Sequence, residues 1–492
     1  MDTRTILDRF AWINQFPRCP KNENALRSAI CRWADASGFD HIRDAAGNLL
    51  VRVPANDALP SAPILVIQGH MDMVCEKTPV SDHDFTADPI ELIFDGDWVR
   101  AKDTTLGADN GIALALAMVL AEQDNLPRPP LELLFTVEEE TGLNGALALE
   151  PGFLQGRRLL NIDSEEEGVF TVGCASGRDA DISLKITPES LRKEMTLFHL
   201  AVGGMSGGHS GIDIHRQRAN AIKTLARVLA ALLSKTDLRL VTIKGGTVKN
   251  AIPREAGAVV AVSGGKLEQL QKVANRLRTH IVTEHAHTDP DFQLTWDKMA
   301  DGTSFEEMLT AADTLRVVQL LQALPDGAQK MWQLPPAPEV VETSCNVARV
   351  SLDNRHFAVL NSMRSLRASR LDLLSARIAS VVALAGGDIT FGGDYPPWLP
   401  DADAEILSRC RTIYENLFAK APEISIIHAG IECAVIGNQY DGMEMISFGP
   451  DIRNPHSPSE KMRISSVGRI WDFLTALVGY YAKGFNHQLG RR

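Results

Sequence analysis

The sequence predicts an α/β protein in which a mainly parallel sheet is interrupted by an inserted α+β domain. Short apolar runs alternate with helical patterns in residues 1–185 and again in residues 393–492, as is typical of a parallel sheet. Residues 186–392 instead group helices with short strands. A chain of 492 residues is also too long for one ordinary core, so we expect more than one packed unit.

The elements of the first domain are expected on both sides of the insertion. Apolar residues at three- and four-residue spacing predict helices on either side of Phe16-Pro17. The pattern then predicts buried strands at residues 64–67, 131–137 and 159–162 and a helix at 112–121. After a proline-rich turn it predicts a helix at 406–418, strands at 424–427 and 445–448, and a final helix. One domain is therefore expected to be split by the other.

The inserted segment has a different character. A strand at residues 197–202 is expected to run into a glycine-rich loop at 203–211, followed by a helix at 220–233. Further strands are predicted at 241–243 and 256–262, and further helices at 267–282 and 371–385. These elements describe a unit large enough to be a domain by itself.

Composition and charge narrow the class of protein. With 45% hydrophobic and 23% charged residues, the chain has the composition of an ordinary globular protein. Its net charge of -12 argues against a nucleic-acid partner, because phosphate binding needs a positive surface. We also expect no membrane partner, because no stretch approaches the roughly 18 apolar residues that span a bilayer.

The cysteines and the amino terminus indicate a cytoplasmic protein. The seven cysteines are scattered, odd in number and without the close spacing of a metal or redox motif. This favours a reducing compartment with mostly buried thiols. Residues 1–13 contain Asp2 and Asp8 and lack a continuous apolar run, so we expect no signal peptide.

Acidic and histidine residues recur at the carboxyl ends of expected strands or at the start of an expected helix. In open α/β sheets, ligand sites form in the crevice outside those strand ends. One such residue alone is usually a solvated turn residue, so it is the conjunction that predicts a site. The residues are His70, Asp109, Glu139, Glu140, Asp163 and His456.

The charges of this set indicate two divalent cations. Asp109, Glu140 and Asp163 supply three negative charges, and a bound hydroxide would supply a fourth, which matches two M²⁺ ions. If Asp109 bridges, each ion gains one histidine and one further carboxylate. That shell suits zinc, manganese or cobalt. Two such ions together acidify water and polarise a carbonyl group.

Neighbouring acidic residues have expected roles of their own. Asp72 lies two positions after His70, on the same side of an extended strand, so we expect it to hold the imidazole. Glu139 precedes Glu140 and would point at the water between the ions as a general base. Strand alternation aims Glu138 away from Glu139, although the sequence leaves the choice between them open.

Longer motifs around these residues resemble the di-zinc metallopeptidases related to aminoacylase and glutamate carboxypeptidase. Within that family, they resemble the cytosolic aminoacyl-histidine dipeptidases. The resemblance covers essentially the whole chain, with the motifs in the right order. The matching stretches are GHMDMV at Gly69, TTLGADNGI at Thr104, TVEEETG at Thr136, NIDSEEEG at Asn161, GGHSG at Gly207, GGTVKNAIPREA at Gly245, VVETSCNV at Val340, IIHAGIEC at Ile426 and NPHSP at Asn454.

The resemblance implies a mainly parallel-sheet, di-metal catalytic domain with an inserted lid. It implies that His70 and Asp163 bind one metal ion, that Glu140 and His456 bind the other, and that Asp109 bridges them. Zinc is the expected metal, with manganese or cobalt as alternatives.

The two catalytic positions of the family match Asp72 and Glu139. The motif at residues 136–142 departs from the usual form, because Glu138 and Thr141 stand where smaller or uncharged residues are usual. This departure changes the charge expected near Glu139, but Glu139 still matches the family's position for the base.

The resemblance also suggests five residues of the lid and the carboxyl-terminal part as candidates for binding the substrate or stabilising the oxyanion. His209 resembles the lid histidine that stabilises the tetrahedral oxyanion. Asn250 and Arg364 resemble residues that bind the backbone and the free carboxylate of the substrate. His428 and Glu432 are candidates for lining the pocket. In relatives with a small lid the oxyanion histidine comes from a partner chain, whereas the large lid here could let one chain supply it internally. The resemblance thus leaves open whether the histidine acts within its own chain, and whether the protein is a homodimer.

The resemblance implies a dipeptidase that takes unblocked dipeptides, including carnosine-like Xaa-His substrates. The nearest alternative is an N-acyl-amino-acid deacylase on the same scaffold. A more distant alternative is a catalytically inactive, metal-binding scaffold protein, since fold does not guarantee function.

Overall fold

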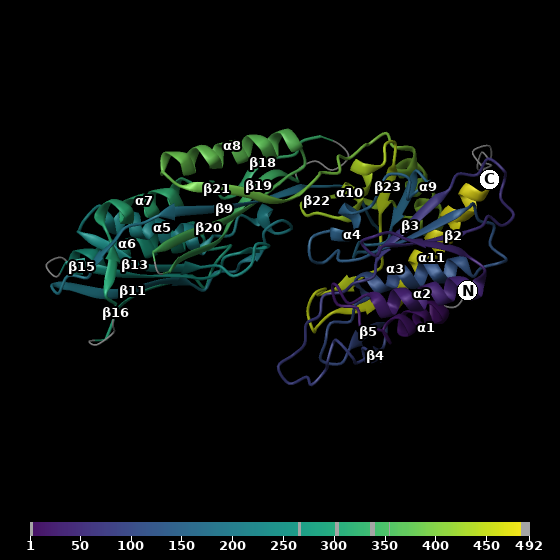
Figure 1. Ribbon diagram of the computed structural model, residues 1–492, viewed down its shortest axis with the longest axis horizontal. Helices are drawn as coiled ribbons and strands as arrows, with labels where there is room; N and C mark the ends of the chain where they lie inside the picture. Colours follow the sequence, from purple (N-terminus) through teal and green to yellow (C-terminus); the bar gives the residue numbers. More distant parts are fainter. Residues whose placement is uncertain (1–2, 264–266, 301–304, 335–339, 354, 484–492) are drawn as a thin grey trace.

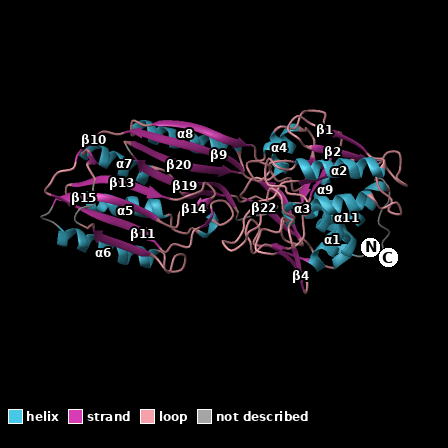
Figure 2. Ribbon diagram, turned by 60° about the horizontal axis from the view of Figure 1, so that its bottom comes forward, coloured by secondary structure: helices cyan, strands magenta, loops and turns pink. Residues whose placement is uncertain are grey.

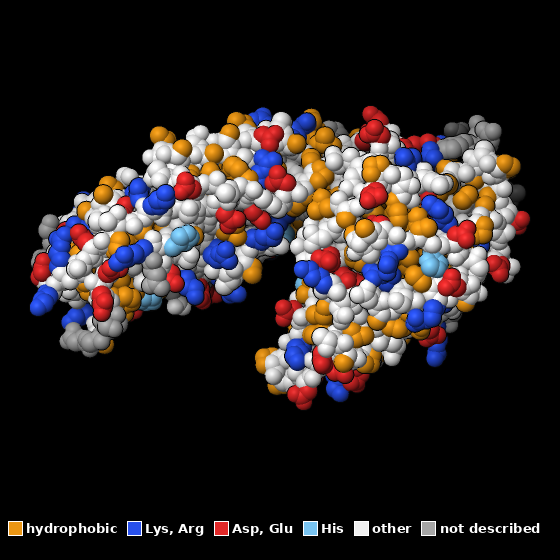
Figure 3. Space-filling model, viewed as in Figure 1, with side chains coloured by type: hydrophobic (Ala, Val, Ile, Leu, Met, Phe, Trp, Pro, Cys, Tyr) orange, Lys and Arg blue, Asp and Glu red, His pale blue; other side chains and the backbone are white. Residues whose placement is uncertain are grey.

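The computed structural model describes residues 3–263, 267–300, 305–334, 340–353 and 355–483. The chain forms two lobes (Figure 1). One lobe holds both chain ends, and the other consists of the middle of the chain (Figure 1). The surface is deeply indented between the two lobes (Figure 3).

The lobe with the chain ends is built around a mixed sheet whose central strands are parallel. The neighbouring strands β6, β3, β7 and β23 run in one direction, whereas β2 pairs antiparallel with β6 and β8 pairs antiparallel with β23. The carboxyl ends of four adjacent strands therefore lie at one edge of the sheet. In the described part of the chain this sheet has eight strands, in the order β1 (Asp40–Arg43), β2 (Leu49–Val53), β6 (Leu131–Thr136), β3 (Leu65–His70), β7 (Arg158–Asn161), β23 (Glu444–Ser447), β8 (Val169–Cys174) and β22 (Glu423–Ile427).

Helices cover both faces of this sheet, because the strands are apolar on both sides. Leu65 and Ile67 of β3 belong to a core shared with one set of helices, and Val66 belongs to a core on the other face. The first set comprises α1 (Thr3–Ile13), α2 (Asn24–Ser37), α3 (Ala108–Ala121), α9 (Glu405–Phe418) and α11 (Ile464–Ala482). The second comprises α4 (Asn144–Leu147) and α10 (Glu432–Gln439).

A small antiparallel sheet lies beside the start of α3. Among the described residues it has four strands, in the order β24 (Ile452–Arg453), β25 (Lys461–Arg463), β5 (Trp98–Ala101) and β4 (Leu92–Asp95). The loop between β24 and β25 contains His456. The sheet therefore joins the histidine loop of the carboxyl-terminal part to the chain that leads into α3.

The second lobe is built on a long antiparallel sheet (Figure 2). Its described strands follow the order β16 (Gln293–Lys298), β11 (Met195–Gly203), β15 (Ala256–Ser263), β13 (Leu238–Gly245), β19 (Val341–Asp353), β20 (His356–Ser365), β9 (Ser176–Lys185) and β21 (Asp388–Tyr395), and β18 (Gly327–Met331) also pairs with β19. Two short pairs stand outside it, β10 (Pro188–Ser190) with β17 (Glu307–Leu309) and β12 (Gly208–His209) with β14 (Ala251–Ile252).

Four helices pack on one face of this sheet and share its apolar core. They are α5 (Ala221–Leu233), α6 (Leu267–Glu284), α7 (Ala311–Ala323) and α8 (Ala368–Leu384), and a 3₁₀ turn spans Ile214–Arg216. The start of α5 is fixed by Asn220, whose side chain accepts hydrogen bonds from the backbone N–H groups of Ile222 and Lys223. Thr310 caps α7 in the same way through Asp313 N–H.

The predicted fold class is confirmed, with an α/β unit interrupted by an α+β insertion. The predicted strands and helices are present with end shifts of a few residues. One segment differs, because the sequence placed β9 in the first domain whereas β9 pairs with β20 and β21 of the second sheet. By hydrogen bonding, the second sheet thus runs from Ser176 to Tyr395, and the division into domains at residues 185 and 392 stays a prediction.

The expectation of mostly buried thiols holds for four of the seven cysteines, and Cys31 is a half-buried thiol. Cys174, Cys345, Cys410 and Cys433 are buried thiols. Cys19 and Cys75, however, form a disulfide. They are 56 residues apart in the sequence, and their spacing does not predict the pairing. None of the helices in the described ranges is long and apolar enough to cross a membrane.

Candidate active site

The residues predicted from the sequence lie at the carboxyl edge of the parallel strands. His70 is the last residue of β3, and Glu139 and Glu140 follow the end of β6. Asp163 follows β7, and Asp109 stands in the first turn of α3. His456 arrives from the loop after β24, beyond β23. The parallel strand order therefore brings together residues that are hundreds of positions apart.

These side chains form two contact groups that share Asp109. In the first group, Nε2 of the buried His70 lies 3.1 Å from Oδ1 of Asp109 and 3.4 Å from Oδ1 of Asp163. In the second, Nε2 of His456 lies 3.0 Å from Oδ2 of Asp109 and 3.2 Å from Oε2 of Glu140. The two carboxylate oxygens of Asp109 thus face different histidines, which is the arrangement expected of a bridging ligand.

This group fits a pair of divalent cations. Ligand atoms of His70, Asp109 and Glu140 all lie within 4.8 Å of one another. Among the described residues, Oε1 of Glu140 is buried and has no hydrogen-bond partner, so it retains a free acceptor site. Imidazole nitrogen with carboxylate oxygen is a donor set that zinc, manganese and cobalt accept.

The acidity of these groups reflects the crowding of negative charge. Burial lowers the pKa of His70 and His456, but hydrogen bonds to the carboxylates outweigh it and raise the pKa of His456 to about 11 and that of His70 well above its usual range. Burial raises the pKa of Asp163 to about 6. Burial also acts to raise the pKa of Asp109, but the contacts of Asp109 with His70 and His456 outweigh it and lower that pKa. The cluster therefore attracts positive charge strongly.

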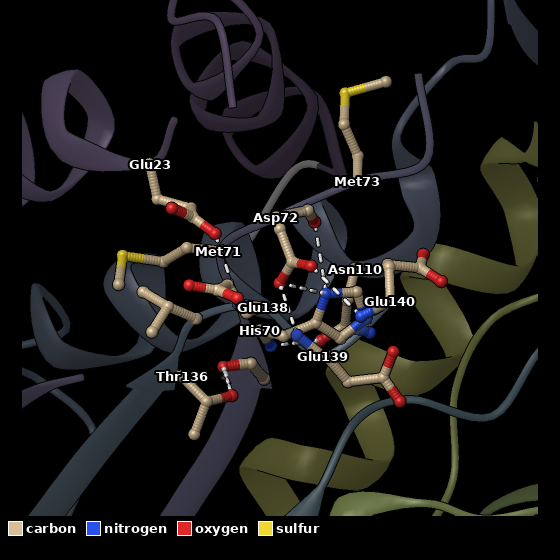
Figure 4. Close-up of polar contacts among 12 residues, drawn as sticks. Glu23, His70, Met71, Asp72, Met73, Asn110, Thr136, Glu138, Glu139 and Glu140 are labelled. Carbon is tan, nitrogen blue, oxygen red and sulfur yellow. Dashed lines mark hydrogen bonds and ion pairs between the residues drawn. The ribbon is translucent and has the colours of Figure 1, made fainter. Parts of the chain in front are cut away.

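Asp72 connects the first histidine to the segment that contains the expected base (Figure 4). Its Oδ1 lies 3.4 Å from Nδ1 of His70, and its backbone oxygen lies 3.1 Å from the same nitrogen. The carboxylate also accepts hydrogen bonds from the backbone N–H groups of Glu139 and Glu140, each at 3.1 Å. Asp72 thus orients the imidazole and also fixes two neighbouring acidic residues, and the second contact was not expected from the sequence.

Glu139 and Glu138 differ in their surroundings. Burial raises the pKa of Glu139 well above its usual range, and the charges of Glu140 and Asp163 act in the same direction. Glu138 adopts a positive φ of 51° and accepts a hydrogen bond from the side chain of Asn144. Glu139 therefore lies among the cluster, while Glu138 is tied to the start of α4.

Three residues of the second lobe, His209, Asn250 and Arg364, form a separate group. The pairing of β12 with β14 sets His209 opposite Ala251, next to Asn250. The guanidinium of Arg364, from β20, donates to the Asn250 side-chain oxygen at 3.2 Å and to the Tyr395 hydroxyl at 2.8 Å. We refer to these three residues of the second lobe, together with His428 from the loop between β22 and α10 of the first lobe, as the lid cluster.

His209 is held as a neutral hydrogen-bond donor. Its Nδ1 accepts hydrogen bonds from the backbone N–H groups of Gly211 and Ile212, at 3.2 and 2.9 Å. Burial lowers the pKa of His209 to about 4, and the charge of Arg364 acts in the same direction. With Nδ1 occupied as an acceptor, the ring proton resides on Nε2, which is free to donate to a developing negative charge.

His428 joins the lid cluster to the first lobe within one chain. Its Nε2 lies 2.7 Å from the Ser344 hydroxyl of β19. A Cβ at Gly211 would lie 2.2 Å from the backbone oxygen of His428, so only glycine permits this approach. The loop of His209 therefore contacts the loop between β22 and α10 in the same chain.

Glu432 lies beneath the site rather than at its opening. Its side chain is fully buried and accepts hydrogen bonds from Gln68 and Thr136. Burial raises the pKa of Glu432 to about 8. Its contact with substrate stays a prediction.

Sequence reasoning did not single out several residues that support the site. Asn110 accepts a hydrogen bond from His70 N–H and donates to the Ile162 oxygen at 2.6 Å, so it joins β3 to the end of β7. Arg18 and Glu460 are buried beside the segment that leads to Asp109. The one available signal was the position of Asn110 beside Asp109 in the GADNG motif.

Comparisons with known proteins agree with this geometry. A family model described as a peptidase dimerisation domain matches residues 200–289. The chain is 39% identical over 478 residues to the cytosol non-specific dipeptidase of Escherichia coli, covering 97% of this chain and 98% of that protein. The crystal structure of aminoacylhistidine dipeptidase from Vibrio alginolyticus has a TM-score of 0.85 at 39% identity and covers 98% of both chains.

A more distant structure shows how widely the fold is shared. The aminopeptidase PepT from Bacillus cereus has a TM-score of 0.57 at 14% identity, covering 98% of this chain and 100% of that one, and is similar in fold alone. The 39% identity to the Escherichia coli protein, by contrast, extends over almost the entire chain. The chain therefore belongs to the M20 family of metallopeptidases, among the cytosol non-specific, or aminoacylhistidine, dipeptidases.

Proposed function

We propose that this chain is a two-metal dipeptidase that hydrolyses the peptide bond of unblocked dipeptides, including those that end in histidine. The Escherichia coli and Vibrio alginolyticus relatives support this activity. The observation that carries this proposal is that one chain holds two clusters of opposite chemical character. A carboxylate-rich cluster suited to cations lies at the sheet edge, and a cluster of neutral and cationic donors lies on the lid.

The five residues of the sheet edge would hold the metal ions. His70 and Asp163 would bind one ion, Glu140 and His456 the other, and Asp109 would bridge them, in keeping with their contacts of 3.0 to 3.4 Å. When bound, such ions acidify water and polarise the scissile carbonyl. Zinc is our assignment, with manganese or cobalt as alternatives.

Residues of the chain would then move the proton and stabilise charge. Glu139 takes a proton from the attacking water and delivers it to the leaving amine, while Asp72 fixes its backbone N–H. His209 donates from Nε2 to the oxyanion that forms at the carbonyl carbon. Arg364 and Asn250, already hydrogen-bonded to each other, bind the terminal carboxylate of the substrate.

The proposal includes the setting in which the protein works. We place it in the cytoplasm, as the name of the Escherichia coli relative indicates for that protein. We infer that His209 acts within its own chain, because its loop contacts the loop of His428. A homodimer through residues 200–289 is also proposed, on the basis of the dimerisation-domain match, and a solution mass of a single chain would refute it.

The test is hydrolysis of a substrate panel by chelator-stripped protein with and without added Zn²⁺, Mn²⁺ or Co²⁺. The panel contains free dipeptides, the same dipeptides with an acylated amine, and tripeptides. We expect metal-restored cleavage of free dipeptides alone. Cleavage of acylated substrates alone would make the protein a deacylase, and no cleavage with two metals bound would make it an inactive scaffold.

A further inference from the structure

Two buried charged residues enclose the short segment that leads into the bridging ligand Asp109. Glu460 is 2% exposed and Arg18 is 1% exposed. They come from opposite ends of the chain, and both contact residues 106–109. Buried charges are costly unless they are paired or hydrogen-bonded, so their placement here needs a reason.

Glu460 gathers the backbone of this segment. Its Oε2 accepts hydrogen bonds from the N–H groups of Leu106 and Gly107 at 2.8 and 3.0 Å. Its Oε1 accepts from the N–H groups of Ala108 and Asp109 at 2.8 and 3.3 Å. A single carboxylate thus fixes the four successive peptide groups that aim the Asp109 side chain.

The same residue anchors the loop of the second histidine. Glu460 lies four residues after His456, whose side chain is 50% exposed, whereas the His70 side chain is 1% exposed. Asn454 and His456 have positive φ values of 54° and 57°, a conformation that non-glycine residues hold only where the surroundings impose it. The pairing of β24 with β25 fixes the two ends of this loop, and Glu460 attaches it to the segment of Asp109.

Arg18 holds the opposite side of the segment. It donates to the backbone oxygen of Gly107, which also gives its N–H to Glu460. It donates as well to the backbone oxygens of Met71 and Asp72, at 3.1 and 3.0 Å. A Cβ at Gly107 would lie 2.3 Å from the Arg18 guanidinium, so this close approach requires glycine. Arg18 therefore ties the segment of Asp109 to the segment of His70 and Asp72.

We propose that Arg18 and Glu460 are a positioning pair that fixes the three ligand-bearing segments relative to one another, so that the site holds two cations rather than one. Neither residue touches the substrate. Glu460 sets Asp109 and His456, and Arg18 sets Asp109 against His70. The inference rests on the two-metal site of the proposed function. The ion between Glu140 and His456 should depend on the pair most, because its histidine lies on the exposed loop.

The principal test is Glu460→Gln in the metal-loaded enzyme. Glutamine keeps the size of the side chain but has one acceptor oxygen, so two of the four N–H groups would face an amide that donates. We expect the weaker metal ion to dissociate about 10- to 100-fold more readily against a competing chelator, as supporting residues of metal ligands typically show. The absorption spectrum of the Co²⁺-loaded protein should change, and kcat should fall with little change in KM.

A matched control comes from the eight-stranded sheet, at the edge opposite the site. Glu132, in the amino-terminal half of β6, is 2% exposed and accepts backbone N–H groups from Gln155 and Gly156. Glu132→Gln removes a comparable buried acceptor, so it should lower the melting temperature to a similar extent while two metal ions still bind with wild-type affinity. For Arg18, the test variant is Arg18→Met, which should weaken binding of the same ion. Its control is Arg128→Met, because Arg128 is also buried and donates to the backbone oxygens of Pro54 and Gln123.

Two conservative variants keep the test decisive if the first fails to fold. Glu460→Asp and Arg18→Lys retain their charges, so we expect them to retain two ions with intermediate affinity. Wild-type affinity for both ions and an unchanged Co²⁺ spectrum in Glu460→Gln, or in these variants if that one does not fold, would overturn the positioning role. If the wild-type chain itself holds fewer than two ions, the proposed function fails instead, and the two failures are thereby distinguished.

Discussion

The sheet edge and the lid cluster both contain histidines, yet the two regions treat them in opposite ways. At the sheet edge, carboxylates raise the pKa of His70 and His456. In the lid cluster, burial and the neighbouring charge of Arg364 lower the pKa of His209 to about 4 and that of His428 to about 3. The histidines of the sheet edge thus lie among carboxylates, whereas the buried histidines of the lid cluster lie beside a cation and stay neutral.

This contrast matches the needs of peptide hydrolysis. Ions must be held where water is activated, and negative charge appears both on the scissile carbonyl and at the substrate's terminal carboxylate. The anionic region supplies the first condition, and the donor-rich lid supplies the second. If the contrast is functional, variants in the two regions should fail in different ways.

The largest effect should come from Glu139, which is buried among the proposed ligands and is not assigned as one of them. Glu139→Gln removes the base while leaving the proposed ligands intact, so kcat should fall by about 10²- to 10⁴-fold. Metal content, measured by elemental analysis, should stay at two ions per chain. Glu138→Gln is the control, because Glu138 is tied to Asn144 and should leave kcat nearly unchanged. If both variants lose activity equally, Glu139 is not the specific base.

His209 should come next, because it tests the donor role of the lid. His209→Gln should lower kcat by about 10²- to 10³-fold, the usual cost of removing one oxyanion donor. Unlike Glu139→Gln, it should also weaken binding of a tetrahedral phosphinic dipeptide analogue.

The control for His209 is His215→Gln. His215 is an exposed histidine six residues further along the same lid segment, and it hydrogen-bonds the backbone oxygen of Ile212. It should leave both kcat and analogue binding unchanged. If His209→Gln lowered only the melting temperature and left kcat and analogue binding unchanged, the proposed difference between the two regions would be wrong.

Arg364 should have a smaller and more selective effect. Lysine keeps the charge but loses the planar fork, so Arg364→Lys should raise KM for a free dipeptide by about 10- to 100-fold, the range of a charged hydrogen-bonded contact. KM for the corresponding dipeptide amide should change little. Arg370→Lys, on the surface of α8, serves as the control. An equal rise for acid and amide would show that Arg364 does not recognise the carboxylate.

The regions also differ in how well the sequence predicted them. The residues at the sheet edge could be located because each follows an apolar run or begins a helix, and parallel strands collect such positions. Arg18 and Glu460 could not be found this way, because their partners are backbone groups, which leave no residue pattern. The place of β9 in the second sheet was missed for a similar reason, since strand pairing partners such as β20 are remote in sequence.

The smallest effect concerns His428 and the pH dependence of stability. Burial, Arg364 and His209 lower its pKa to about 3 in the folded chain, whereas an unfolded histidine titrates near pH 6.5. As pH falls from about 6.5 towards 3, the unfolded state therefore binds a proton that the folded state does not, and stability is lost by up to ~1.4 kcal/mol per pH unit.

His428→Gln removes this loss along with the hydrogen bond to Ser344. Its cost to the free energy of unfolding should therefore shrink by about 2 kcal/mol between pH 7.5 and pH 5, as measured by urea denaturation. Ser344→Ala removes the same hydrogen bond but no titrating group, so its cost should be equal at the two pH values. Equal costs for both variants at both pH values would mean that His428 titrates as it does in the unfolded chain, and the electrostatic contrast would then rest on His209 alone.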